Sequence, residues 1–214
     1  MRQDFKYVIW IFGCLITISA YAGSPFQHRA GIAFRSSYWH QRADDSMIQV
    51  RSRQIFDNEV NVDGVGGWLM FFSGSGENGL IVFSLGGFVH VRVVEEGLFS
   101  EQVDVQVISP ILLGYQHAIF QNRNTSAFLP YVSAGGGPYV ITHVHQISYS
   151  LMDDEVTVTN RIKPGAYVGL GSYFFVTDWF AFHGELRYHF VNFNPTHDLS
   201  GFEFGLGLAF SWRR

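Results

Sequence analysis

Residues 201–214, which read GFEFGLGLAFSWRR, constrain the fold of this chain more than any other segment. Successive side chains of a β-strand point to opposite faces. Here one face would carry only large apolar groups, and the other would carry glycine, alanine, serine and the single carboxylate of Glu203. An apolar face opposite a crowded face of small residues is typical of a narrow closed barrel whose outer side meets lipid. The segment therefore predicts a transmembrane β-strand.

The N-terminal segment predicts export. Arg2 and Lys6 form a short basic region, residues 8–20 (VIWIFGCLITISA) form an apolar run, and Ala20-Tyr21-Ala22 resembles a cleavage site. The run is shorter than a membrane-spanning helix requires, which disfavours an uncleaved anchor. A lipoprotein signal at Cys14 is also disfavoured, because the apolar run continues past it. We predict a signal peptide at residues 1–22 and one barrel domain at residues 23–214.

Composition narrows the class of the exported part. The only cysteine, Cys14, lies in the predicted signal peptide, so a disulfide-held scaffold is excluded. The signal peptide carries a net +1 of the chain's −4, which leaves −5 and no basic surface for nucleic acid. With 21 Phe and 23 Gly and no later apolar run of helix length, membrane residence requires a closed barrel.

Alternating segments bounded by turn-forming residues recur along the chain. They predict strands at about 28–40, 65–72, 80–95, 102–120, 128–140, 163–176, 179–193 and 199–212. Residues 41–63 and 148–161 are interpreted as surface loops, the first with an added strand in its middle, and residues 73–79 as a glycine-rich turn. The fold class is all-β: a single eight-stranded, antiparallel, up-and-down transmembrane barrel, although a count of ten remains open. Long loops after alternate strands place both termini in the periplasm.

The chain resembles the small bacterial outer-membrane β-barrels of the OmpA, OmpX and opacity-protein kind. The resemblance rests on the signal peptide, on LPYVSAGGGPYV and GELRYHF, and on a last strand that ends in the aromatic Trp212. It implies residence in the outer membrane of a Gram-negative cell envelope. The implied partners are lipids, lipopolysaccharide and the barrel-assembly machinery, although Arg213 and Arg214 follow the usual terminal aromatic. A soluble, lipocalin-like barrel is the alternative fold.

A second resemblance is to lipid A deacylases of the PagL kind, which have a His-x-Ser-Asn segment and a later glutamate. The corresponding residues are His189-Phe190-Val191-Asn192 and Glu203. Val191 has no hydroxyl to act as a nucleophile, and the alternation places His189 and Glu203 inside the barrel rather than on its wall. We therefore predict no enzyme and keep His189 and Glu203 as the alternative catalytic pair.

The same alternation gathers polar residues in the barrel's interior. The predicted lumenal network consists of Arg35, His90, Arg92, His183, Glu185, Arg187, His189 and Glu203. Because a narrow eight-stranded interior is filled by side chains and buried charges must be paired, we interpret this network as structural rather than conducting.

No motif predicts a cofactor or a metal. His143 and His145 would share a strand face, but no third ligand has a suitable spacing. The expected function is a structural or surface-interaction role without an open pore. A lipid A-modifying enzyme and an OmpW-like carrier of small hydrophobic molecules are the alternatives.

Overall fold

The computed structural model describes residues 29–41, 48–54, 57–75, 78–96, 100–119, 128–149, 155–191 and 199–213. Within these ranges, the side chains at 48–54, 57–63, 92, 94–96, 100–102, 147–149, 155 and 213 are not described. The predicted signal peptide lies outside the described residues. Within them, no helix is long and apolar enough to cross a membrane.

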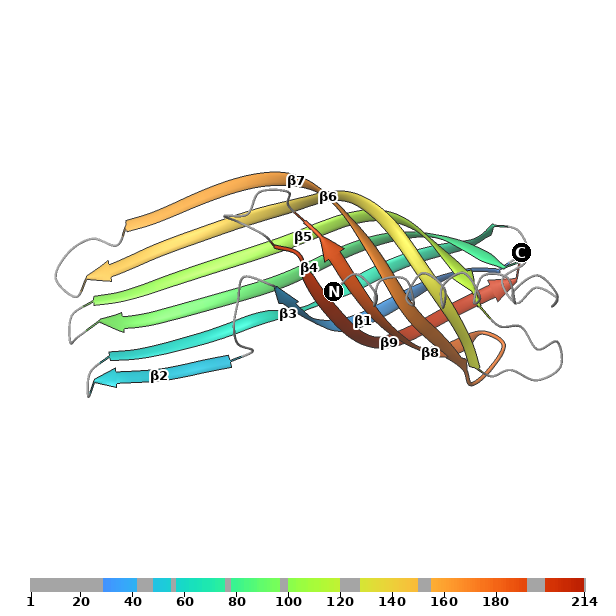
Figure 1. The fold of residues 1–214 in the computed structure, drawn as a ribbon, viewed down its shortest axis with the longest axis horizontal. Coiled ribbons are helices and arrows are strands. Elements are labelled where there is room, and N and C mark those ends of the chain that lie inside the picture. Colours follow the sequence, from blue (N-terminus) through green and yellow to red (C-terminus); the bar gives the residue numbers. More distant parts are fainter. Residues whose placement is uncertain are drawn as a thin grey trace, which may run out of the picture.

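In the described part of the chain, nine strands make up one antiparallel sheet (Figure 1). They are β1 (Arg29–Gln41), β2 (Ile48–Gln54), β3 (Asp57–Ser75), β4 (Gly79–Glu96), β5 (Ser100–Ala118), β6 (Phe128–Tyr149), β7 (Glu155–Phe175), β8 (Phe180–Phe190) and β9 (Gly201–Arg213).

The sheet closes into a barrel because β1 pairs with β9 on one side and with β3 on the other. Consecutive strands from β3 to β9 are neighbours, while β2 pairs with β3 alone and stays outside the ring. The closed ring therefore has eight strands, which confirms the predicted fold class and answers the question of eight or ten. The strand outside the ring, β2, corresponds to the added strand expected inside residues 41–63.

Cross-strand pairing defines how far the strands are staggered. On one side, Gly201 of β9 pairs directly with Gln41 of β1. On the other side, the row of paired residues that starts at Gly201 runs around the barrel through β8 to β3 and reaches β1 at Gly31. The shift is 41 − 31 = 10 residues, and the row passes through His189, Tyr167, Gly135, Gly114, Val82 and Phe72. Because stagger and tilt are linked in a barrel, the strands cross the wall obliquely.

The strands differ greatly in length. β1, β8 and β9 have 13, 11 and 13 residues, close to the 9–11 or so that a tilted strand needs to span a bilayer. β3 to β7 have 18 to 22 residues and continue well past the others at one end of the barrel (Figure 1). We call this continuation of β2–β7 the projecting sheet.

Two predicted loops were too long, because parts of them belong to the projecting sheet. Residues 57–63 begin β3, and residues 155–161 begin β7. Their sequences are polar, yet the pairing of Val158 with Val144 continues the ladder of the barrel without a break. Valines do alternate with polar residues in both segments, at Val60 and Val62 and at Val156 and Val158. The alternation is short and lies among charged and amide side chains, which favoured the interpretation as loops.

Candidate functional site

Polar side chains gather in the middle of the barrel, where alternation turns every second residue of β1, β8 and β9 inward. Six of these inward-facing side chains carry an ionisable group and are at most 2 % exposed. The lumenal charge cluster, as we call it, consists of Arg35, His183, Glu185, Arg187, His189 and Glu203.

Arg35 lies between the two carboxylates of the cluster. Its Nη1 forms an ion pair with Glu185, and its Nη2 donates to Oε1 of Glu203 at 2.7 Å. Its Nε donates to Oγ of Ser37 at 3.2 Å. Because a guanidinium presents five donors in one plane, it can link two acidic groups from different strands. Arg35 thereby joins β1 to β8 and β9.

Arg187 is held by one ion pair and two aromatic rings. Its Nη2 lies 2.8 Å from Oε2 of Glu185. Its guanidinium carbon lies 4.4 Å from the ring centre of Tyr167 and 4.9 Å from that of Trp68, within range of cation–π attraction. The cation paired with Glu203 is therefore Arg35, and Arg187 is paired with Glu185.

Glu203 also accepts hydrogen bonds from two other groups. Trp68 Nε1 donates to its Oε1 at 2.7 Å, and His189 Nε2 lies 2.7 Å from its Oε2. The other nitrogen of the same imidazole, Nδ1, lies 2.8 Å from the hydroxyl of Tyr139. Both ring nitrogens of His189 thus have partners, which fixes the orientation of the ring.

The opposite end of the cluster is organised around Glu185. Ser133 donates to its Oε1 at 2.6 Å, and His183 Nε2 lies 3.8 Å from its Oε2. Tyr131 is hydrogen-bonded to His183, whose ring also stacks on Tyr173 at 4.7 Å between centres.

The charges of the cluster balance. Two guanidinium groups face two carboxylates, and every ion pair among them joins side chains that are 0 % exposed. Each enclosed charge has an opposite charge beside it, which offsets part of the cost of desolvation. Nε and Nη1 of Arg187 are buried without a hydrogen-bond partner among the described residues. The arrangement links strands chemically but leaves no exposed reactive group.

One member of the predicted network, His90, lies apart from the cluster. His90 Nε2 contacts the Gln41 amide at 2.9 Å, and its Nδ1 accepts from the backbone of Gly64 at 3.1 Å. The side chain of Arg92 lies outside the described part of the structure.

Sequence reasoning missed the aromatic half of the site. Trp39, Trp68, Tyr131, Tyr139 and Tyr167 are buried among the charges, although the predicted lumenal network contains no aromatic residue. Residues 68–72 are all apolar, so the sequence does not distinguish the face that carries Trp68, Met70 and Phe72 from the opposite face. Trp68 pairs with Arg35 where β1 meets β3, and this pairing would have placed Trp68 in the lumen. It can be known only once the register of the two strands is known.

The residues considered for metal binding lie on the projecting sheet. His145 Nδ1 is hydrogen-bonded to Asp104, and His143 Nε2 lies 3.3 Å from the Gln106 amide. Among the residues that the structure describes, no three His, Cys, Asp or Glu side chains are placed to hold a metal ion.

Comparison with known proteins identifies the fold. No protein-family model matches the sequence, and no curated sequence is similar to it. The outer membrane protein OprG from Pseudomonas aeruginosa is 14 % identical with a TM-score of 0.54, over 90 % of this chain and 98 % of OprG. Ail of Yersinia pestis is 13 % identical with a TM-score of 0.49, over 90 % of this chain and 100 % of Ail.

At these identities the similarity concerns the fold alone, and OprG carries it. The chain has the fold of the small, eight-stranded outer-membrane β-barrel proteins, as the sequence resemblance predicted.

Proposed function

We propose that this protein is an integral outer-membrane barrel that serves as a closed anchor and displays the projecting sheet at the cell surface for interaction with other molecules. The observation that carries the proposal is the contrast between a filled lumen and five strands that continue past it. In this proposal both termini lie in the periplasm. The barrel-assembly machinery inserts the chain, and the barrel's partners in the membrane are lipid and lipopolysaccharide.

The outer wall supports membrane residence. Phe204, Leu206 and Trp212 of β9 are 54–60 % exposed, while Glu203, Gly205 and Ser211, which each precede one of them, are buried. The same outward apolar pattern continues on β8 and β1 through Leu186 and Phe34. An apolar belt one bilayer thick around a polar interior is the arrangement of barrels embedded in lipid.

The interior supports a role without an open pore. Above the charge cluster, Trp39 packs edge-on against Phe88 at 5.2 Å between ring centres and lies 6.0 Å from Tyr139. Below the cluster, the hydroxyl of Tyr173 donates to Gln116 at 2.9 Å. Side chains thus fill successive levels of the lumen, as expected for eight strands.

The experiment combines fractionation with electrical recording. We expect the protein in the outer-membrane fraction, with migration on gels that changes on heating, and we expect planar bilayers containing it to show no discrete conductance steps. Recovery as a detergent-free soluble protein would refute membrane residence and favour the lipocalin-like alternative. Reproducible single-channel steps would refute the closed anchor.

One observation favours a second function, the carriage of small hydrophobic molecules. A groove of about 380 Å³ crosses the outer wall from β5 to β9, lined by apolar groups that include Tyr115, Val168, Leu186 and Phe202. Quenching by brominated alkanes of a tryptophan placed in the groove (Phe202→Trp), compared with the same variant carrying the groove-filling Ala134→Phe substitution, tests it. Equal quenching of both proteins would exclude specific binding in the groove.

The geometry gives no support to lipid A deacylation. His189 and Glu203 are 0 % exposed and Val191, in the position of the nucleophile, is buried as well. A deacylase needs its reacting groups within reach of lipid. Mass spectrometry of lipid A with and without the gene tests this alternative, and unchanged acylation would eliminate it.

A further inference from the structure

The outward side of the projecting sheet carries a row of directly paired valines. Val91 of β4 pairs with Val105 of β5, Val105 pairs with Val144 of β6, and Val144 pairs with Val158 of β7. Val107 and Val156 lie on the same side in the neighbouring rows. We call this side of the projecting sheet the valine face.

The opposite side of the same strands is polar. His90, Asp104, Gln106, His143 and His145 alternate with the valines and point toward the space above the barrel. Two pairs among them, His145 with Asp104 and His143 with Gln106, are hydrogen-bonded. The apolar side of the projecting sheet is therefore turned away from the molecule's own polar side, and Val156, Val158 and Ile162 are 55–71 % exposed.

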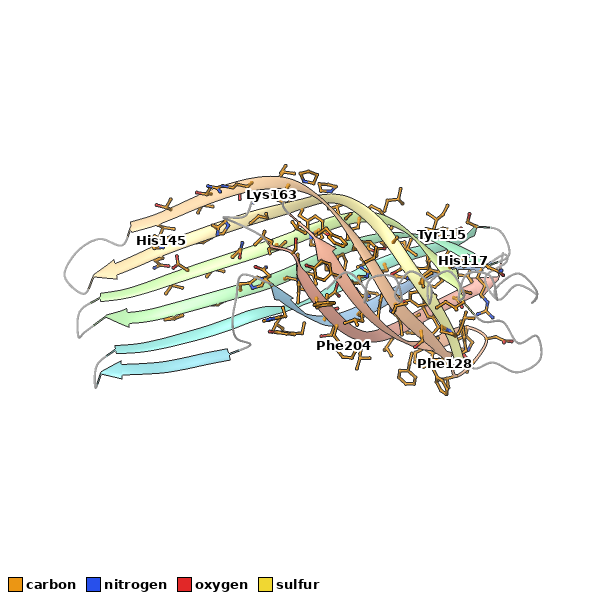
Figure 2. The ribbon with its side chains drawn as sticks, in the orientation of Figure 1. Tyr115, His117, Phe128, His145, Lys163 and Phe204 are labelled. Atoms are coloured by element: carbon orange, nitrogen blue, oxygen red, sulfur yellow. The ribbon has the colours of Figure 1, made fainter. Side chains whose placement is uncertain are left out.

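If β1, β8 and β9 span the full thickness of the bilayer, the valine face lies outside it. β8 ends at Phe190 and β9 begins at Gly201, so the ring is complete only below that level. His145 lies on the projecting part, far from Phe204 on the barrel and from Tyr115 and His117 at the other end (Figure 2). With strands about 4.8 Å apart and outward residues about 6.7 Å apart, three rows on four strands cover roughly 400 Å². Nine of the twelve positions are valine and the other three are the uncharged polar residues Thr142, Gln146 and Asn160, so the apolar part is about 300 Å². Uncovered apolar patches of this size commonly mark interaction sites.

We propose that the valine face binds the valine face of a second copy in the same membrane, with a two-fold axis along the barrel axes. This proposal rests on the membrane placement proposed above. Anchoring in one bilayer fixes the height of the sheet, and a second copy presents its valine face at the same height and in the same orientation. The valine row is uncharged, so two copies meet without repulsion, and aligned sheets pack face to face at about 10 Å.

The apolar surface is continuous from the valine face to the lipid-facing wall. On β4 it extends from Val89 through Leu85 to Phe83, and on β5 from Val107 to Ile111 and Leu113. The barrels of two copies can therefore approach below the contact between the sheets without burying a charged side chain. The sugars and phosphates of the membrane surface would leave the valines in contact with water, whereas a second copy removes them from it.

Matched substitutions at neighbouring positions test the proposal in vesicles of phosphatidylcholine and phosphatidylglycerol. Val105 faces outward and Gln106 faces the polar side of the same strand. With the mature chain free of other cysteines, we expect a short bifunctional thiol reagent to trap Val105→Cys as a dimer and to leave Gln106→Cys monomeric. We expect Val105→Glu to lower the dimer fraction about tenfold or more, and Gln106→Glu to leave it unchanged.

The outcomes separate this proposal from the one on which it rests. Failure of the wild-type protein to insert in the vesicles would refute the membrane placement. Insertion of folded protein that stays monomeric at every protein-to-lipid ratio would refute the dimer alone. Equal trapping through Val105→Cys and Gln106→Cys would also refute it, because it would indicate random collision. Gel migration before and after heating verifies that each variant is folded.

Discussion

The same pair of chemical groups occurs in two regions of this molecule with different surroundings. In the lumen, His189 and Glu203 lie in contact at 0 % exposure, and on the projecting sheet the hydrogen-bonded His145 and Asp104 are 39 % and 42 % exposed. In the lumen the pair is closed off by Trp68, Tyr139 and Arg35, whereas on the projecting sheet water reaches both partners. Closure of the ring decides how much each contact stabilises the fold, because water competes for groups that it can reach.

The largest effect is expected from removing the cation shared by both carboxylates. Arg35→Met leaves Glu203 without its guanidinium partner in an enclosed site, and we expect a loss of about 3–5 kcal/mol in the free energy of unfolding. Urea titration of the folded fraction in vesicles measures it. The control is Arg161→Met on the exposed part of β7, expected to change stability by less than about 0.5 kcal/mol. Equal effects of the two substitutions would contradict the contrast.

The next largest effect is expected where two neighbouring strands of the barrel wall are in close contact. A Cβ on Gly207 would lie 2.0 Å from the backbone oxygen of Phe34, so Gly207→Ala forces β9 and β1 apart. We expect a loss of about 1–3 kcal/mol, the usual cost of overpacking. Gly87→Ala adds the same methyl group where no atom lies within 4 Å, and serves as the control in the same urea titration. A destabilised Gly87→Ala together with an unaffected Gly207→Ala would reverse the expectation.

A single hydrogen bond in the lumen should have a smaller effect. Tyr139→Phe removes the hydroxyl that contacts Nδ1 of His189 and leaves that nitrogen buried, at an expected cost of about 1 kcal/mol. Tyr115→Phe, on the outer wall, is the matched control with little expected effect. Thermal unfolding in detergent compares the two, and no difference between them would show that the buried bond contributes nothing net.

The smallest effect is expected on the projecting sheet. Asp104→Asn removes the charge that faces His145, and because both partners are solvated we expect less than about 0.5 kcal/mol. The urea midpoint at low and high salt measures it. A loss comparable to that of Arg35→Met would mean that the projecting sheet is closed off from water.

Much of the barrel was predictable because lipid and a narrow lumen impose opposite demands on neighbouring residues. The alternation of Phe202, Glu203, Phe204 and Gly205 gives the inward and outward sides of β9 directly. The same reasoning placed Glu185 and Arg187 on one face of β8. The same reasoning failed for the part of β7 above the ring, where Val156, Thr157 and Val158 are all exposed and neither side of the sheet faces a closed lumen.

The partners of the charges could not be predicted. Arg35 and Glu203 are 168 residues apart, and their contact depends on the closing pair of β1 with β9 in a register that leaves Gly205 and Gly207 beside Arg35. The sequence predicted residues 199–212 as a transmembrane strand with a carboxylate on its inner side. Only the tertiary structure decided that Arg35 meets that carboxylate, since a stagger of ten residues sets which side chains share a level of the lumen.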